Sequence, residues 1–93
     1  MKAEFLTSGV VDILKERSEQ IHKHNHTLKS DAKYTKGELQ QVAIAIIAMD
    51  INLYPKDWNQ VHWDKIAKKP RTEQLAIAGA FLAAEIDRLK KNT

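Results

Sequence analysis

The sequence contains no cysteine, only three glycines and two prolines, and no apolar run longer than "VAIAIIAM" (42–49). Without cysteine, disulfide bonds, thiolate nucleophiles and cysteine-based zinc sites are all excluded. The apolar run is far shorter than the roughly 20 residues that a membrane span needs, and no basic segment followed by an apolar stretch opens the chain. We therefore expect a cytoplasmic protein that does not enter the membrane.

The length of 93 residues predicts a single domain over 1–93. A chain of this size buries only roughly 60 to 65% of its unfolded surface, so a homodimer or larger homo-oligomer would add burial that the monomer lacks. The net charge of +3 comes from residues of both signs mixed along the chain. A nucleic-acid partner is compatible with this charge but not favoured, and a small anionic ligand fits at least as well.

Helix-forming residues dominate, and no long period-2 pattern occurs, so the chain is predicted to be all-α. We expect a compact bundle of three main helices with an irregular, Trp-rich connector before the last one. Thr35 and Glu38 have the spacing of a capping box at the start of the second helix. The predicted order is a first helix over about 8–25, a loop over 26–34, a second helix over 35–51, the connector over 52–71, with one or two short helical turns, and a last helix over 72–91.

The last predicted helix has two kinds of surface. One stripe is expected to face the core, and it consists of Leu75, Ala78, Gly79, Leu82, Ile86 and Leu89. Other faces carry small residues, which let a second helix approach closely from the same chain or from a partner: Ala76, Ala80, Ala83 and Ala84. These faces leave a helical protein-interaction module open as a function.

Three histidines, His22, His24 and His26, follow one another near the end of the first predicted helix. On a continuous helix His22 and His26 would lie one turn apart and could hold zinc together with Asp31. No second half of a metal motif is present, and histidines near a helix C-terminus also suit the helix dipole. We therefore predict no metal and no cofactor.

Two carboxylates, Glu16 and Glu19, form an E-x-x-E pair of the kind that all-α nucleotide pyrophosphohydrolases use to hold magnesium. Such enzymes need a matching E-x-x-D on a later helix. Here Gln41 stands three places after Glu38, and Arg88 three places after Glu85, so the E-x-x-D half of the motif is absent. Magnesium-dependent hydrolysis stays an alternative, and no catalytic residue is assigned.

Arg17 and Glu85 are charged residues at positions where the predicted helices carry apolar stripes. A charge there is costly unless it is paired. The two residues are therefore expected either to form an ion pair between the first and last helices or to orient polar groups of a ligand.

The connector and the start of the last helix combine aromatic and cationic side chains. Donors for phosphate oxygens and ring faces for base stacking come together in a short stretch. A phosphate there would also meet the N–H groups at the start of the last helix. The predicted ligand-binding residues in this stretch are Trp58, His62, Trp63, Lys69 and Arg71, to which Arg17 and Glu85 are added.

Five segments, in this order and spacing, resemble a family of short tailed-phage and prophage proteins. They are "ERSEQI" (16–21), "SDAKYTKGEL" (30–39), "YPKDW" (54–58), "KKPR" (68–71) and "AGAFLAAEIDRL" (78–89), so the resemblance covers 16–89. The matching positions are Arg17, Gln20, Asp31, Glu38, Trp58, Trp63, Lys69, Pro70 and Glu85. The chain departs from the family at Ser30 and Tyr34, where histidines are common, and at Tyr54, which replaces a tryptophan.

The resemblance implies an accessory protein of the infected bacterial host's cytoplasm. Small phage proteins of the sequestin-like kind counter host defence by binding nucleotide immune signals in pockets of small oligomers. The predicted function is therefore binding and sequestration, without catalysis, of a nucleotide-derived anion such as a cyclic ADP-ribose isomer or a cyclic dinucleotide.

Overall fold

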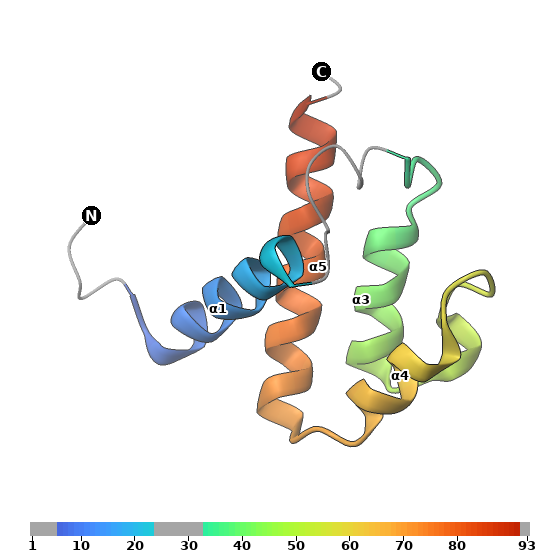
Figure 1. The fold of residues 1–93 in the computed structure, drawn as a ribbon, viewed down its shortest axis with the longest axis horizontal. Helices are drawn as coiled ribbons and strands as arrows, with labels where there is room; N and C mark the ends of the chain where they lie inside the picture. Colours follow the sequence, from blue (N-terminus) through green and yellow to red (C-terminus); the bar gives the residue numbers. More distant parts are fainter. Residues whose placement is uncertain (1–5, 24–32, 92–93) are drawn as a thin grey trace.

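The computed structural model describes residues 6–23 and 33–91, which are all-helical and contain no strand (Figure 1). The elements are α1 (Ser8–His22), α3 (Glu38–Ala48), the 3-10 turn η2 (Ile51–Leu53), α4 (Gln60–Ala67) and α5 (Arg71–Lys91). The all-α prediction is confirmed. None of the described helices combines the length and apolarity that crossing a bilayer requires.

The helices α3 and α5 form the centre of the fold and lie side by side in opposite directions (Figure 1). The Arg71 guanidinium, at the start of α5, donates to the carbonyl oxygens of Ile46 (3.1 Å) and Ile47 (2.6 Å) at the end of α3. A cation at a helix C-terminus satisfies carbonyls that have no partner within the helix. Arg71 thus fixes the start of α5 against the end of α3.

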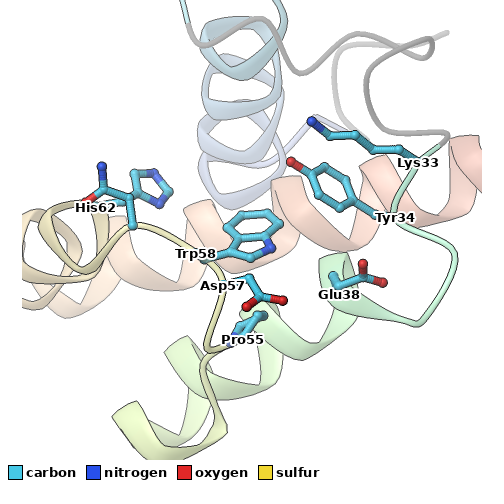
Figure 2. Close-up of a pocket in the computed structure, with 8 residues that line it drawn as sticks. Lys33, Tyr34, Glu38, Pro55, Asp57, Trp58 and His62 are labelled. Atoms are coloured by element: carbon cyan, nitrogen blue, oxygen red, sulfur yellow. The ribbon is translucent and has the colours of Figure 1, made fainter.

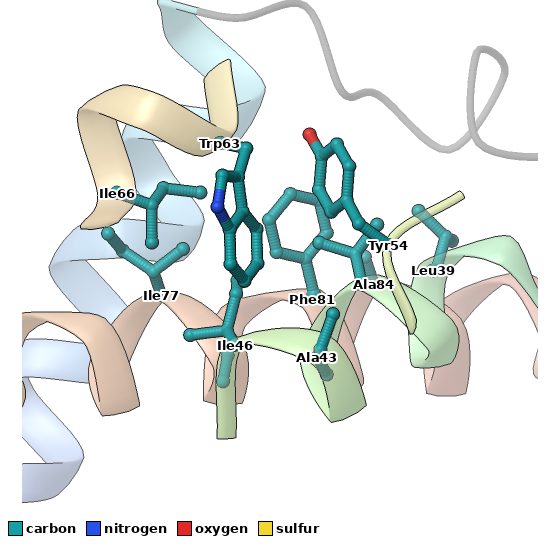
Figure 3. Packing of buried hydrophobic residues seen from close by; sticks show 12 residues of the cluster. Leu39, Ala43, Ile46, Tyr54, Trp63, Ile66, Ile77, Phe81 and Ala84 are labelled. Carbon is teal, nitrogen blue, oxygen red and sulfur yellow. The ribbon is translucent and has the colours of Figure 1, made fainter. Parts of the chain in front are cut away.

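One core joins α3, α4, α5 and the segment after η2 (Figure 3). Trp63 and Ile66 from α4 enter between α3 and α5, and Phe81 is 1% exposed at the centre of α5. The other core residues are Leu39, Val42, Ala43, Ala45, Ile46, Tyr54, Ile77, Ala78 and Ala84. The predicted connector is therefore largely a structural element, because its second half forms α4 and supplies core side chains.

The orientation of α5 differs from the prediction. Its alanines face inward, with Ala80 and Ala84 at 0% and 1% exposed, whereas Leu82 and Ile86 are 40% and 53% exposed. The reason is close helix packing: small residues let neighbouring helices approach, and this requirement outweighs burial of the larger side chains. Ala76, Ala80 and Ala84 therefore pack within the chain.

The second predicted helix begins later than its sequence indicated. Thr35 does not cap it; Gly37, at φ 80°, is the N-cap, and the left-handed conformation there suits a residue without a Cβ. The predicted capping box does not form, since a Glu38 carboxylate oxygen accepts from the Lys36 N–H at 2.6 Å, whereas the Thr35 N–H donates to the Lys33 carbonyl oxygen. The helix ends at Ala48, before Met49 in the left-handed region, and Asp50 then caps η2 through the Asn52 N–H.

The first helix crosses α5 at Gly79 (Figure 1). A Cβ added to Gly79 would lie 2.8 Å from Cδ1 and 2.9 Å from Cγ1 of Ile13. Glycine in a helix interior costs about 1 kcal/mol relative to alanine, so its presence here reflects a need for space. The helix ends at His22, earlier than predicted, and His24, His26 and Asp31 lie outside the described residues.

The crossing predicts that Gly79→Ala destabilises the protein by about 1 to 3 kcal/mol, because overpacking against Ile13 outweighs the gain in helix propensity. Urea denaturation followed by circular dichroism measures this change. In an Ile13→Ala background the same substitution should become neutral or stabilising. An equal loss in both backgrounds would contradict the contact.

Candidate functional site

A cavity with a volume of about 650 Å³ opens between the segment before α3 and the segment that leads into α4 (Figure 2). Its lining residues are Lys33, Tyr34, Glu38, Pro55, Asp57, Trp58, Asn59 and His62. Pockets for small molecules commonly measure about 300 to 1,000 Å³. We refer to this cavity as the Trp58 pocket.

Aromatic rings hold Trp58 in place. Its ring centroid lies 5.1 Å from that of Tyr34, 6.2 Å from that of Tyr54 and 5.8 Å from that of Phe81. These separations fall in the range in which aromatic pairs attract one another. Trp58 is half-buried, so the core fixes one part of its side chain while the rest lines the pocket.

The polar groups of the pocket carry both signs of charge. The Lys33 ammonium lies 5.1 Å from the centre of the Tyr34 ring, within the range of a cation–π contact. Figure 2 shows the Trp58 ring between His62 and Tyr34, with the Glu38 and Asp57 carboxylates together along one side. The pocket therefore offers donors from Lys33 and His62 and acceptors from Glu38 and Asp57.

His62 is oriented by Tyr54, whose hydroxyl lies 3.1 Å from the imidazole Nδ1. Burial raises the pKa of Tyr54 to about 12, so its phenol keeps its proton at neutral pH. This contact holds the imidazole ring of His62 in place beside the pocket.

Buried charges lie next to the pocket. The Arg88 guanidinium donates to both carboxylate oxygens of Glu85, and both residues are buried. The hydrogen bond to Glu85, followed by the charges of Glu85 and Glu38, raises the pKa of Arg88. Glu38 also lines the Trp58 pocket.

Arg17 and Glu85 do not form the pair that the sequence suggested. Arg17 instead donates to Gln20 (3.2 Å) and forms the interhelical ion pair with Asp87 (3.3 Å), whereas Glu85 is held by Arg88 within α5. Neither Arg17 nor Glu85 lines the Trp58 pocket. The expectation of a charged contact between α1 and α5 is thus met, but with a different carboxylate.

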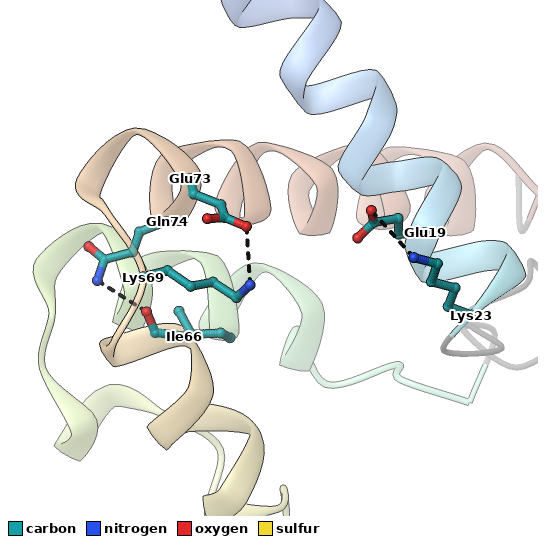
Figure 4. Close-up of polar contacts among 6 residues, drawn as sticks. All are labelled: Glu19, Lys23, Ile66, Lys69, Glu73 and Gln74. Atoms are coloured by element: carbon teal, nitrogen blue, oxygen red, sulfur yellow. Dashed lines mark hydrogen bonds and ion pairs between the residues drawn. The ribbon is translucent and has the colours of Figure 1, made fainter.

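Trp63, Lys69 and Arg71 have separate positions and contacts in the structure. Trp63 is 6% exposed, so the surrounding core covers the ring faces that were expected to stack on a base. Lys69 pairs with Glu73 at 3.1 Å (Figure 4), and Arg71 caps α3. Of the residues predicted to bind a ligand, only Trp58 and His62 line the large pocket.

The E-x-x-E pair on α1 lies beside α5. Burial raises the pKa of Glu16, and the nearby charges of Glu19 and Glu73 raise it further. A smaller cavity of about 140 Å³ separates this pair from Lys65 and Lys69. Within 6–23 and 33–91 no group of three or more His, Asp or Glu side chains could hold a metal ion.

Six lining residues were not predicted as ligand contacts: Lys33, Tyr34, Glu38, Pro55, Asp57 and Asn59. Tyr34 and Glu38 had been interpreted only as parts of a helix start. Their nearness to Trp58 depends on how the segment before α3 meets the segment after η2, and that contact spans about 20 residues without a local pattern to reveal it.

The raised pKa of Tyr54 gives a test in alkaline solution. Titration of tyrosinate absorbance, taken as wild type minus Tyr54→Phe, should show a midpoint near pH 12. Since the folded pKa exceeds the usual value of about 10, the stability that Tyr54 contributes is complete below pH 10 and lost as the pH rises toward 12. Tyr54→Phe should therefore lose less stability over that interval. A difference midpoint near pH 10 would contradict the burial of this phenol.

Comparison with known proteins found no match, so the function is inferred from the geometry of the pocket and its neighbours. No family model, no curated protein and no solved structure matches the chain. The features that bear on function are consequently the Trp58 pocket, the oriented His62 and the buried ion pair beside Glu38.

Proposed function

We propose that the protein binds a small nucleotide-derived anion in the Trp58 pocket and sequesters it without turnover. The observation that carries this proposal is the size and lining of the pocket, about 650 Å³ with Tyr34 and Trp58 on its wall and Lys33 and His62 among its polar groups. A base and an anionic group need these two kinds of surface together.

The aromatic wall would bind the base. Stacking on a protein ring is worth about 1 to 3 kcal/mol per base and tolerates any base. The Trp58 ring is held by Tyr54 and Phe81, so little side-chain freedom remains to be lost when a ligand binds. A rigid aromatic surface of this kind favours affinity.

The polar groups would set the orientation of the ligand. Lys33 can donate to phosphate oxygens and the His62 imidazole lines the same pocket, whereas the Glu38 and Asp57 carboxylates would repel phosphate. The carboxylates can instead accept from amino groups of a base or from ribose hydroxyls. The phosphates would thus lie toward Lys33 or His62 and the donor edge of the ligand toward Glu38 and Asp57.

The resemblance to phage proteins suggests which nucleotides to test. A host immune signal, such as a cyclic ADP-ribose isomer or a cyclic dinucleotide, combines bases, ribose hydroxyls and phosphates in one compact molecule. A protein with such a pocket and no assigned catalytic residue would act by lowering the free concentration of the signal.

Binding is tested with a panel of mononucleotides, cyclic dinucleotides and ADP-ribose derivatives, using thermal shift and then titration calorimetry. We expect at least one of them to bind and Lys33→Ala to weaken that binding by about 10-fold or more, since a hydrogen bond to a charged group contributes about 1.5 to 3 kcal/mol. Lys36→Ala is the matched control, because Lys36 is also exposed but does not line the pocket.

Three results would contradict the proposal. One is the absence of binding across the panel at millimolar concentration, and another is an equal loss in Lys33→Ala and Lys36→Ala. The third is recovery of a cleaved ligand by mass spectrometry after denaturation of the complex, which would indicate an enzyme. Trp58 fluorescence, read in a Trp63→Phe background, reports whether the ligand reaches the pocket.

A further inference from the structure

The side of the α3–α5 pair that faces away from the core is apolar and exposed. Six large aliphatic side chains on it are 40 to 53% exposed. We call this surface the outer face, and it consists of Ile44, Ile47, Leu75, Leu82, Ile86 and Leu89. Scattered exposed aliphatic residues are ordinary, but a set this large on two neighbouring helices indicates an interaction surface.

The outer face is continuous because of the way α3 and α5 meet. Arg71 holds the start of α5 against the carbonyls of Ile46 and Ile47, so the end of α3 and the first turns of α5 are neighbours. On each helix the exposed aliphatic residues lie opposite the buried set, which includes Val42 on α3 and Ala84 on α5. The end of α3, with Ile47, is therefore close to the first turns of α5, where Leu75 lies.

The outer face stays exposed although other helices pack on α5. Residues of α1, including Gln20, and residues of α4, including Ile66, line one small cavity together with Ile77 and Phe81 of α5. The helix α1 also crosses α5 at Gly79, beside the outer face, and the aliphatic residues of α5 on that face keep 40 to 53% of their surface exposed with α1 in place. The molecule measures only 22 Å along its shortest axis, about two helix diameters.

The spacing along α5 is that of a helix that pairs with another helix. Leu75, Leu82 and Leu89 are seven residues apart, and Ile86 stands four residues after Leu82 and three before Leu89. Such alternation of three and four residues keeps one stripe facing a partner helix along its length. Residues 39–49, which span α3 and the residue after it, include no charged side chain, and neither do residues 74–84 of α5. These two stretches therefore provide no charged group to bind a phosphate-rich or strongly charged partner.

We propose that the outer face is the interface of a symmetric homodimer, in which α5 of one chain packs against α5 of a second copy and α3 flanks it on both sides. The six side chains present on the order of 500 Å² of apolar surface, and polar neighbours at the rim bring this near the roughly 800 Å² per partner of a stable interface. A self-complementary apolar stripe suits a two-fold arrangement, because each residue then meets the same kind of residue. The dimer would bury aliphatic surface that the small core of one chain leaves in water.

The proposal is tested by sedimentation equilibrium of the full chain across roughly 1 to 100 μM, the affinity range typical of interfaces of this size. Wild type should sediment at twice the chain mass of 10.6 kDa at the upper end. Leu82→Glu and Ile86→Glu should each weaken the dimer by at least about 10-fold, since a charge buried at an interface is costly. Both side chains are exposed in the monomer, so circular dichroism should show folded helices in both variants.

Val61→Glu is the matched control, because Val61 is 56% exposed on α4 and lies outside the outer face. It should leave the dimer affinity within about twofold of wild type. A wild-type monomer at 100 μM would overturn the proposal, and so would dimers that persist in both Leu82→Glu and Ile86→Glu. The outer face lies away from the Trp58 pocket, so nucleotide binding and dimerisation can fail independently.

Discussion

The packing of α5 against its neighbours through small residues is the constraint on which the rest of the structure depends. Ala80 and Ala84 are almost fully buried, and Gly79 leaves space for Ile13 where α1 crosses. Because the backbones approach closely, Phe81 and Trp63 fill the centre of a thin molecule without a large aliphatic core. With its alanines buried, α5 has its leucines exposed. The orientation of this one helix therefore determines both the core and the outer face.

The Trp58 pocket also depends on this arrangement, because core side chains hold two of its lining residues in place. Phe81 lies at the centre of α5 and contacts both Trp58 and His62 through its ring, and Tyr54 contacts Trp58, Trp63 and His62. The pocket therefore inherits its rigidity from the core. The charged groups are divided in a similar way: Arg71 and Lys69 stabilise helix ends and helix surfaces, while Lys33 and His62 face the pocket.

The sequence predicted the helical class and the start of α5 to within a residue, because these depend on local capping, breakers and periodicity. It placed the end of α3 at about 51, whereas the helix ends at Ala48. It did not predict which face of α5 is buried, because both the leucine stripe and the alanine faces can serve as a helix interface, and only the tertiary packing decides between them. Trp58 and His62 were predicted in the site, but Trp63 was assigned to the ligand although it fills the core. Composition cannot separate these two tryptophans, since both stand in the same short segment.

The most direct test of the account compares Ala84→Leu with Leu82→Ala by urea denaturation, in an Ile86→Glu background that keeps the chain monomeric. If α5 faces the core with its alanines, Ala84→Leu should cost about 1 to 3 kcal/mol through overpacking. Leu82→Ala should change the free energy of unfolding by less than about 1 kcal/mol, as exposed positions do. The opposite order, a loss of about 2 to 5 kcal/mol in Leu82→Ala and tolerance of Ala84→Leu, would place the leucine stripe in the core and contradict the account.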